Sequence, residues 1–276
     1  MRRLIAGWGL ATLALAALPA AAASRVVVVA TTTSVQDSGL LDVLVPMFER
    51  RTALAVKPIP VGTGQALALA ARGEADVVLA HAPALERQYV AQGALRNRRP
   101  VMANDFVVVG PPGDPARVQG AGTAVEALRR IAATGARFIS RGDRSGTHAV
   151  EVALWRTAGL EPRAPWYLES GQGMGATLAI ASDRRAYSLT DRATLLALGR
   201  RLDLAIVLAG GPDLRNVYAV LEVNPANGPR VNAAGGRAFA DFLVSPDAQE
   251  VIRTFGVDRY GRALFVPLAG RAEAED

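Results

Sequence analysis

The sequence contains no cysteine among its 276 residues, so disulfide bonds, thiolate metal sites and thiol nucleophiles are excluded together. Its only histidines, His81 and His148, lack the spacing of a zinc-binding H-E-x-x-H motif. The single lysine, Lys57, does not stand in a phosphate-binding loop pattern, and no G-x-S-x-G elbow is present. We therefore expect a protein that is not an enzyme, with no metal site and no cofactor, in which both histidines make hydrogen bonds.

Aromatic residues are also scarce, at 5% of the chain, and the basic residues are scattered through it. A nucleic-acid-binding protein more often has a basic stripe with aromatic residues interleaved. The sequence has no such stripe, so we expect no nucleic-acid partner. Its formal net charge of +6 would still produce a mild positive field that helps to collect anions.

Residues 1–23 have the pattern of a secretory signal peptide. Arg2 and Arg3 supply the charged start, Leu4–Leu18 the apolar run, and Ala21–Ala23 a cleavage site of small residues. No later segment is long and apolar enough to span a membrane. Because no cysteine follows the signal, we expect no lipid anchor, and we place the mature protein in the periplasm.

Strand-like and helix-like segments alternate after the signal. Val26–Ala30 is a β-branched run, and the apolar positions of Leu40–Phe48 recur at helical spacing. Val56–Val61 contains Pro58 and Pro60, which predict a strand at the edge of a sheet. This alternation predicts an α/β fold with mostly parallel sheets and helices on both faces.

Four segments share one design, in which a strand ends, small or hydroxyl residues follow, and a helix begins. The first turn of a helix has unpaired N–H groups and a partial positive charge, and both favour anions. Serine and threonine add hydroxyl donors. Each segment alone could be an ordinary helix cap, but four in one chain indicate an anion site if folding brings them together. The segments are Thr31–Ser34, Gly62–Gly64, Ser140–Thr147 and Ser170–Gly175.

The third of these segments is the densest in potential anion donors. Arg141 follows the expected strand by one residue and could pair bidentately with an oxyanion. Ser145, Gly146 and Thr147 would add donors at the start of the next helix. The alternative is a surface loop in which Arg141 pairs with Asp143.

The fourth segment also fits a dinucleotide-binding pattern. Gly171, Gly173 and Ala176 match G-x-G-x-x-A, and Asp191 follows at about the distance, roughly twenty residues, that this pattern expects. An exported nucleotide-dependent enzyme is therefore a second hypothesis. The pattern lies late in the chain and lacks two clear mononucleotide-binding halves, so we prefer the anion-site interpretation.

Several motifs together carry a family likeness: Thr31–Ser34, Asp37–Asp42, Val61–Leu67, Asn104–Val107, Ser140–His148, Trp166–Leu178, Ala186–Arg192 and Asn224–Pro225. They resemble the tungstate-binding components of bacterial ABC importers, in the periplasmic-binding-protein superfamily. The resemblance covers nearly the whole mature chain.

The resemblance implies a two-lobe, type II-like fold with a ligand cleft between lobes that are joined by hinge strands. The first lobe would comprise residues 24–107 and 217–276, and the second lobe residues 108–216 would be inserted into it. It also implies tungstate or molybdate as the ligand, a membrane permease as the partner, and a monomer.

The resemblance assigns ligand contacts to the residues of three of the four segments, and the ligand's chemistry agrees with them. A fully deprotonated dianion offers only acceptors, so N–H and O–H donors satisfy it, whereas hydrogen phosphate would favour a site that includes a carboxylate acceptor. Sulfate has the same acceptors as tungstate, so only cavity size would exclude it. The implied contacts are Thr32, Thr33, Ser34, Thr63, Gly64, Arg141, Ser145, Gly146 and Thr147.

Overall fold

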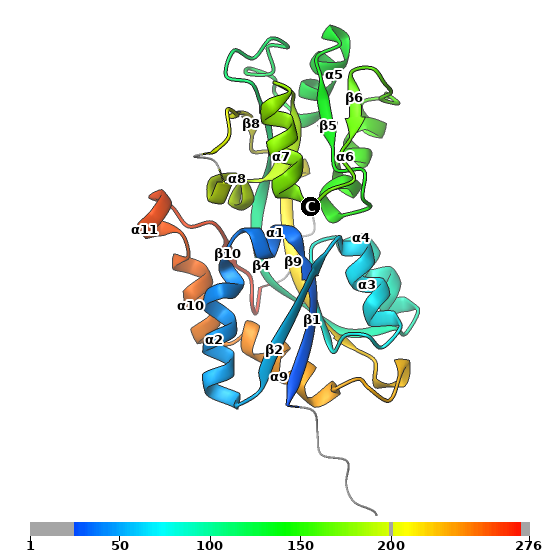
Figure 1. The fold of residues 1–276 in the computed structure, drawn as a ribbon, viewed down its shortest axis with the longest axis vertical. Coiled ribbons are helices and arrows are strands. Elements are labelled where there is room, and N and C mark those ends of the chain that lie inside the picture. Colours follow the sequence, from blue (N-terminus) through cyan, green and yellow to red (C-terminus); the bar gives the residue numbers. More distant parts are fainter. Residues whose placement is uncertain (1–24, 199–200, 272–276) are drawn as a thin grey trace, which may run out of the picture.

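The computed structural model describes residues 25–198 and 201–271, so the expected signal peptide, residues 1–23, lies outside the described residues. Figure 1 shows two lobes, one above the other, which β4 and β9 connect. The strands are β1 (Val26–Thr32), β2 (Ala55–Val61), β3 (Val77–Ala80), β4 (Leu95–Gly110), β5 (Phe138–Ser140), β6 (Tyr167–Glu169), β7 (Ser188–Asp191), β8 (Ala205–Ala209), β9 (Arg215–Val223) and β10 (Val266–Pro267).

The helices alternate with these strands, as the sequence predicts. None of the helices in the described ranges is long and apolar enough to cross a membrane. The helices are α1 (Thr33–Asp37), α2 (Leu40–Thr52), α3 (Thr63–Ala71), α4 (Pro83–Ala91), α5 (Ala124–Thr134), α6 (Gly146–Thr157), α7 (Met174–Asp183), α8 (Arg192–Leu198), α9 (Ala233–Leu243), α10 (Pro246–Thr254) and α11 (Val257–Tyr260), with short 3-10 turns at Pro212–Leu214 and Pro225–Asn227.

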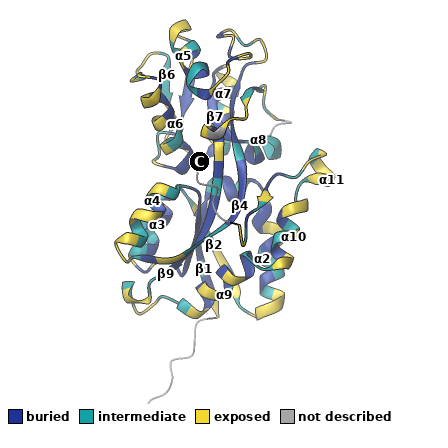
Figure 2. Cartoon of the chain, turned by 180° about the vertical axis from the view of Figure 1, so that it is seen from behind, coloured by how far each residue is buried: buried dark blue, intermediate teal, exposed yellow. Residues whose placement is uncertain are grey.

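Helices cover both faces of the sheet in the lower lobe of Figure 1, in which the strand order is β10-β4-β9-β3-β1-β2. Successive side chains of a strand point to opposite faces. Accordingly, Val27 and Val29 pack with Phe48 of α2 and Phe239 of α9, whereas Ala30 packs with the α3 side. Figure 2 shows the strands buried inside each lobe and the outer helix faces exposed. The two-lobe α/β fold is confirmed, and β2 is the edge strand that its prolines predict.

The upper lobe is built on the far half of β4, which pairs with β7 and β8 there. Phe106 and Val108 point into a cluster with α5 and α6, while Val107 and Val109 point into a second cluster with α7 and α8. The other strands of this lobe, β5 and β6, form a separate two-stranded sheet. Each lobe therefore has hydrophobic clusters of its own.

The prediction of mostly parallel sheets is wrong. Among the described strands the pairs β1–β2, β1–β3 and β5–β6 are parallel, whereas five pairs are antiparallel: β4–β9, β4–β10, β3–β9, β4–β7 and β4–β8. β4 carries the chain from the first lobe to the second and β9 carries it back. The two strands are neighbours in one sheet, so they pair antiparallel. The second half of β4 and most of β9 are buried on both faces, so Phe106–Val109 and Val217–Val223 have the apolar pattern that is typical of parallel strands.

Each of the four helix starts that the sequence predicts follows a strand, directly or after a short loop. α1, α3, α6 and α7 follow β1, β2, β5 and β6. Because β1 and β2 are parallel, with Thr32 opposite Val61, the starts of α1 and α3 lie side by side. Likewise Ser140 of β5 lies opposite Glu169 of β6, and the loops that lead to α6 and α7 begin side by side, with the Gly171 N–H bonded to the Arg141 carbonyl.

Candidate anion-binding site

The four helix starts meet where the two lobes face each other. A methyl group added at Gly62, before α3, would lie 3.4 Å from the carbonyl oxygen of Asp143 in the other lobe. One added at Gly173, before α7, would lie 3.4 Å from the Thr33 methyl group of α1. The Gly175 N–H, in the first turn of α7, also donates to Asp37 of α1 at 3.4 Å. The convergence that the sequence could not establish is therefore present in the fold.

Three buried donor atoms at this convergence have no hydrogen-bond partner among the described residues. They are the hydroxyl oxygens of Thr63 and Thr147 and the Nε of Arg141. Both threonines are fully buried, and Arg141 is 3% exposed. An unpaired buried polar group costs about 1–3 kcal/mol, so folded proteins seldom keep several together. All three atoms can donate, and they come from both lobes, so an acceptor-only group would satisfy them.

Arg141 follows β5 and forms the internal pair that its sequence context suggests as one of two roles. Its Nη2 contacts the Asp143 carboxylate, so the expected internal pair exists, yet the guanidinium is buried instead of lying on the surface. The same Nη2 lies 3.4 Å from the Thr33 hydroxyl of the other lobe. The other Asp143 oxygen accepts the Ser145 N–H at 3.0 Å. Burial alone would raise the pKa of Asp143, but these bonds and the Arg141 charge lower it overall.

Ordinary helix capping accounts for two of the predicted contacts. The Thr32 hydroxyl accepts the Val35 N–H at 3.4 Å and caps α1, and the Ser145 hydroxyl accepts the His148 N–H at 3.2 Å and caps α6. α3 has no side-chain cap, and Thr147 is the second residue of α6. Capping therefore does not explain the buried hydroxyls of Thr63 and Thr147.

His81 follows β3 and makes the hydrogen bonds that the sequence analysis expects of it. It is 3% exposed; its Nδ1 lies 2.9 Å from Asn216 Oδ1 and its Nε2 lies 3.2 Å from the Ser34 hydroxyl. Burial first, and the positive charge of Arg141 in addition, lower the pKa of His81 to about 4, although the Asn216 bond raises it. The imidazole is therefore neutral at pH 7. The other histidine, His148, accepts the Arg144 N–H at 3.1 Å.

The environment of Asp191 argues against the nucleotide-binding alternative. This residue is fully buried, and its carboxylate accepts hydrogen bonds from the Thr194 N–H, the Thr194 hydroxyl and Asn104. It therefore holds the start of α8 and cannot reach a ribose. The backbone at Gly173 packs against Thr33, so the glycines bring two helix starts together.

Glu151, which the sequence did not predict as part of the site, supports the end of β5. Its carboxylate accepts hydrogen bonds from Ser140 at 2.7 Å, Tyr167 at 2.8 Å and Trp155 at 3.1 Å. Burial raises the pKa of Glu151 to about 7 against these bonds, and Glu169 raises it further. The available signal was a single glutamate on the buried face of α6, four residues after Thr147 and four before Trp155.

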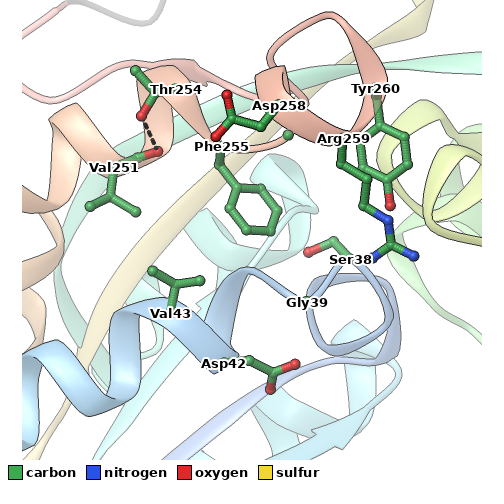
Figure 3. A pocket seen from close by; sticks show the side chains of 11 residues that line it. Ser38, Gly39, Asp42, Val43, Val251, Thr254, Phe255, Asp258, Arg259 and Tyr260 are labelled. Carbon is green, nitrogen blue, oxygen red and sulfur yellow. Dashed lines mark hydrogen bonds between the residues drawn. The ribbon is translucent and has the colours of Figure 1, made fainter.

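A hollow of about 540 Å³ opens between the lobes beside these helix starts. One wall contains Gly64 and Tyr89, and the other contains Gly142, Asp143 and Arg144. A second hollow, of about 480 Å³, lies beside α2 and α11 and contains none of the predicted contacts (Figure 3). The inter-lobe hollow lies next to the donor cluster, because Gly64 adjoins Thr63 and Asp143 contacts Arg141, although none of the three donors lines it.

Comparison with known proteins agrees with this geometry. A family model described as a PBP superfamily domain matches residues 19–247. The tungstate-binding protein TupA of Peptoclostridium acidaminophilum is 42% identical over 247 residues, which are 89% of this chain and 86% of that protein. The chain belongs to the tungstate-binding family of this superfamily.

Solved structures of this family have the same fold. The tungstate ABC transporter structure from Geobacter sulfurreducens shares 48% identity with a TM-score of 0.77, covering 83% of this chain and 98% of that one. The tungstate-binding protein TupA from Desulfovibrio alaskensis shares 40% identity with a TM-score of 0.72, covering 88% and 99%. The family membership and the two-lobe fold that the motifs imply are therefore confirmed.

Proposed function

We propose that this protein binds tungstate or molybdate between its lobes and delivers it to the permease of an ABC importer, with no turnover of its own. The observation that carries the proposal is the set of three unpartnered, buried donors, Thr63, Thr147 and Arg141, at the meeting point of the helix starts. The names of its relatives agree with this ligand class.

The chemistry of the donor set favours an oxyanion without protons. A tetrahedral dianion presents acceptors in all directions, and the neighbouring helix starts add N–H groups and partial positive charge. The one carboxylate in contact with Arg141 belongs to Asp143, which already accepts from Arg141 and Ser145. Both Asp143 oxygens are therefore already engaged by donors of the protein, and the three unpartnered groups are all donors.

The proposed lobes are residues 24–107 with 217–276, and residues 108–216. The hydrophobic clusters support chain crossings close to these boundaries, because Met102 packs in one lobe and Phe106 in the other. Where the chain returns to the first lobe, Leu214 still packs with the second lobe and Tyr218 packs with the first. Rotation about β4 and β9 would open the site and admit the ligand.

The proposed setting follows from the signal-like residues 1–23. The protein would act in the periplasm as a monomer and present its closed, ligand-bound form to the permease. A nucleic-acid partner has no place in this proposal, because the basic residues form no stripe.

Ligand-dependent melting of the mature protein, residues 24–276, tests the proposal. A ligand at about one hundred times its Kd stabilises the folded state by about 2.7 kcal/mol. Tungstate and molybdate should raise the melting temperature, and calorimetric competition should rank them against sulfate. Hydrogen phosphate and acetate serve as controls. The ligand class is wrong if a control raises the melting temperature while tungstate and molybdate do not.

A further inference from the structure

A row of side-chain hydrogen bonds crosses the hinge and ends at the anion site. Asp191 of β7 accepts from Asn104 of β4 at 3.3 Å, and Asn104 accepts from Asn216 of β9 at 2.8 Å. Asn216 Oδ1 lies 2.9 Å from Nδ1 of His81, and Nε2 of His81 lies 3.2 Å from the Ser34 hydroxyl of α1. All five side chains are buried. The row links the second lobe to the first through both hinge strands.

The far end of this row determines the direction of every hydrogen in it. Asp191 Oδ1 accepts the Thr194 backbone N–H at 2.8 Å, so the Asn104 amide group must face Asp191 with its NH2. The Asn104 oxygen then accepts from the Asn216 NH2, and the Asn216 oxygen faces His81. Nδ1 of His81 must therefore carry a hydrogen. In a neutral imidazole this leaves a lone pair on Nε2.

Nε2 of His81 therefore accepts a hydrogen bond from the Ser34 hydroxyl, whose hydrogen points toward His81 and away from the site. Ser34 donates to His81, and its oxygen lies 3.0 Å from the Thr32 hydroxyl, which can donate to it. The Ser34 hydroxyl then has no hydrogen to offer a ligand. An oxyanion without protons needs donors. In this arrangement Ser34 presents only its oxygen, an acceptor, to the ligand proposed above.

A proton on Nε2 removes this mismatch. Nε2–H would donate to the Ser34 oxygen, and the Ser34 hydroxyl hydrogen would turn toward the ligand. We propose that oxyanion capture takes up one proton from solvent onto Nε2 of His81, so that Ser34 becomes a ligand donor. This inference rests on the proposed function and assigns His81 as a positioning residue that does not touch the ligand.

The groups around His81 agree with protonation only when the anion is bound. The start of α6 lies against the ring at Gly146, and Tyr218 of β9 and Phe106 of β4 pack on it with ring centroids 4.6 and 6.2 Å away. Arg141 opposes a positive charge on the ring and contributes to the low pKa of His81, about 4. A dianion held by Arg141 would offset the positive charge of Arg141 and so raise the pKa of His81.

The other charged groups near this packing already have partners. Asp37 of α1 accepts the Gly175 N–H at 3.4 Å, and burial raises its pKa while this bond and Arg141 lower it. Asp143 contacts Arg141, and Asp191 accepts three hydrogen bonds at the far end of the row. On the α4 side, Glu86 accepts the Ala82 N–H at 2.6 Å and pairs with Arg98. The bound oxyanion is therefore the group whose arrival changes the charge beside His81.

Isothermal titration calorimetry of the mature protein with tungstate tests the proton uptake. Titrations at one pH in buffers of different ionisation enthalpy report the number of protons bound, and a pH series from 6.5 to 8.5 reports the affinity. Between the pKa of His81 in the complex and about 4, Kd should fall by up to tenfold for each unit that pH is lowered. His81→Gln should bind without proton uptake, and His148→Gln, the matched control, should keep it.

Nitrogen NMR of the two histidines tests the same inference in the unaltered chain. The ligand-free protein should show His81 as the neutral Nδ1–H form, and tungstate should convert it to imidazolium; His148→Gln assigns the signals. Tungstate binding with a neutral His81, or proton uptake that persists in His81→Gln, overturns this inference and leaves the proposed function intact. Absence of tungstate binding overturns the proposed function itself.

Discussion

The backbone of Gly146 in one lobe lies directly against His81 of the other. A methyl group at Gly146 would be 2.8 Å from the His81 carbonyl oxygen and 2.9 Å from its ring. Real Cβ atoms do not approach backbone this closely. Glycine at the first residue of α6 is therefore what allows the two lobes to meet at the anion site.

Gly146→Ala should weaken tungstate binding while the fold survives. The added methyl group clashes only when the lobes are together, and overpacking of this kind costs about 1–3 kcal/mol. Calorimetry should show Kd raised by roughly tenfold or more. Gly113→Ala, where a methyl group meets nothing within 4 Å, is the control. Equal affinity of Gly146→Ala and the parent would mean that the lobes bind the ligand further apart.

Thr63→Val and Thr147→Val should each weaken oxyanion binding without lowering the stability of the ligand-free protein. Each removes a buried, unpartnered hydroxyl, and a hydrogen bond to a charged group contributes about 1.5–3 kcal/mol. Urea unfolding and calorimetry separate the two effects. Thr190→Val, which removes a bonded hydroxyl, should do the reverse and lower stability. Unchanged affinity for tungstate in both site variants would show that these hydroxyls do not contact the ligand.

Arg141→Ala should weaken tungstate binding by about 1.5–3 kcal/mol, the range for a charge-assisted hydrogen bond. Arg141→Lys should restore only part of this, because an ammonium keeps the charge but loses the planar fork. Titration calorimetry of the three proteins makes the comparison. Should Arg141→Ala bind as the parent does, the Arg141–Asp143 pair is purely structural, and the ligand is held by backbone amides and hydroxyls.

Glu151→Gln should flatten the dependence of stability on pH. The pKa of Glu151 is raised to about 7 from an ordinary 4.5, so its protonated form favours folding. That contribution is present below about pH 4.5 and is lost as pH rises through 7. Glutamine keeps an oxygen for Tyr167 and Trp155 and can donate to Ser140.

The measurement is the free energy of unfolding at pH 5 and pH 8. The parent should lose stability between them, on the order of 1–3 kcal/mol from this group, and the variant should lose less. Parallel profiles for the two proteins would show that the Glu151 carboxylate is ionised in the folded state without penalty.

Small-angle scattering should show a smaller radius of gyration when tungstate is present. The lobes touch through Gly62 and Asp143, and the donors of both lobes reach one ligand only in this arrangement. Without ligand, opening would let water satisfy Thr63 and Thr147. An unchanged radius despite tight binding would show that the ligand-free protein is already closed.

The sequence by itself determined the local features of this protein. The hydroxyl and glycine residues at or after the ends of β1, β2, β5 and β6 precede helices as predicted, because caps and first turns depend on neighbouring residues. The prolines of β2 place it at an edge because proline cannot donate to a neighbouring strand. The motifs also sufficed to identify the family.

Only the tertiary structure decided how these parts meet. Strand direction was misjudged because antiparallel strands covered on both faces have the same apolar pattern as parallel ones. Asp191 looked like part of a nucleotide site, and only its burial against Asn104 and Thr194 showed its place at the end of the hinge row. Glu151 and the partners of His81 depend on residues far apart in the chain. Spacing along a sequence reports contacts within a turn or a strand, whereas contacts between lobes are set by how the strands are connected and packed.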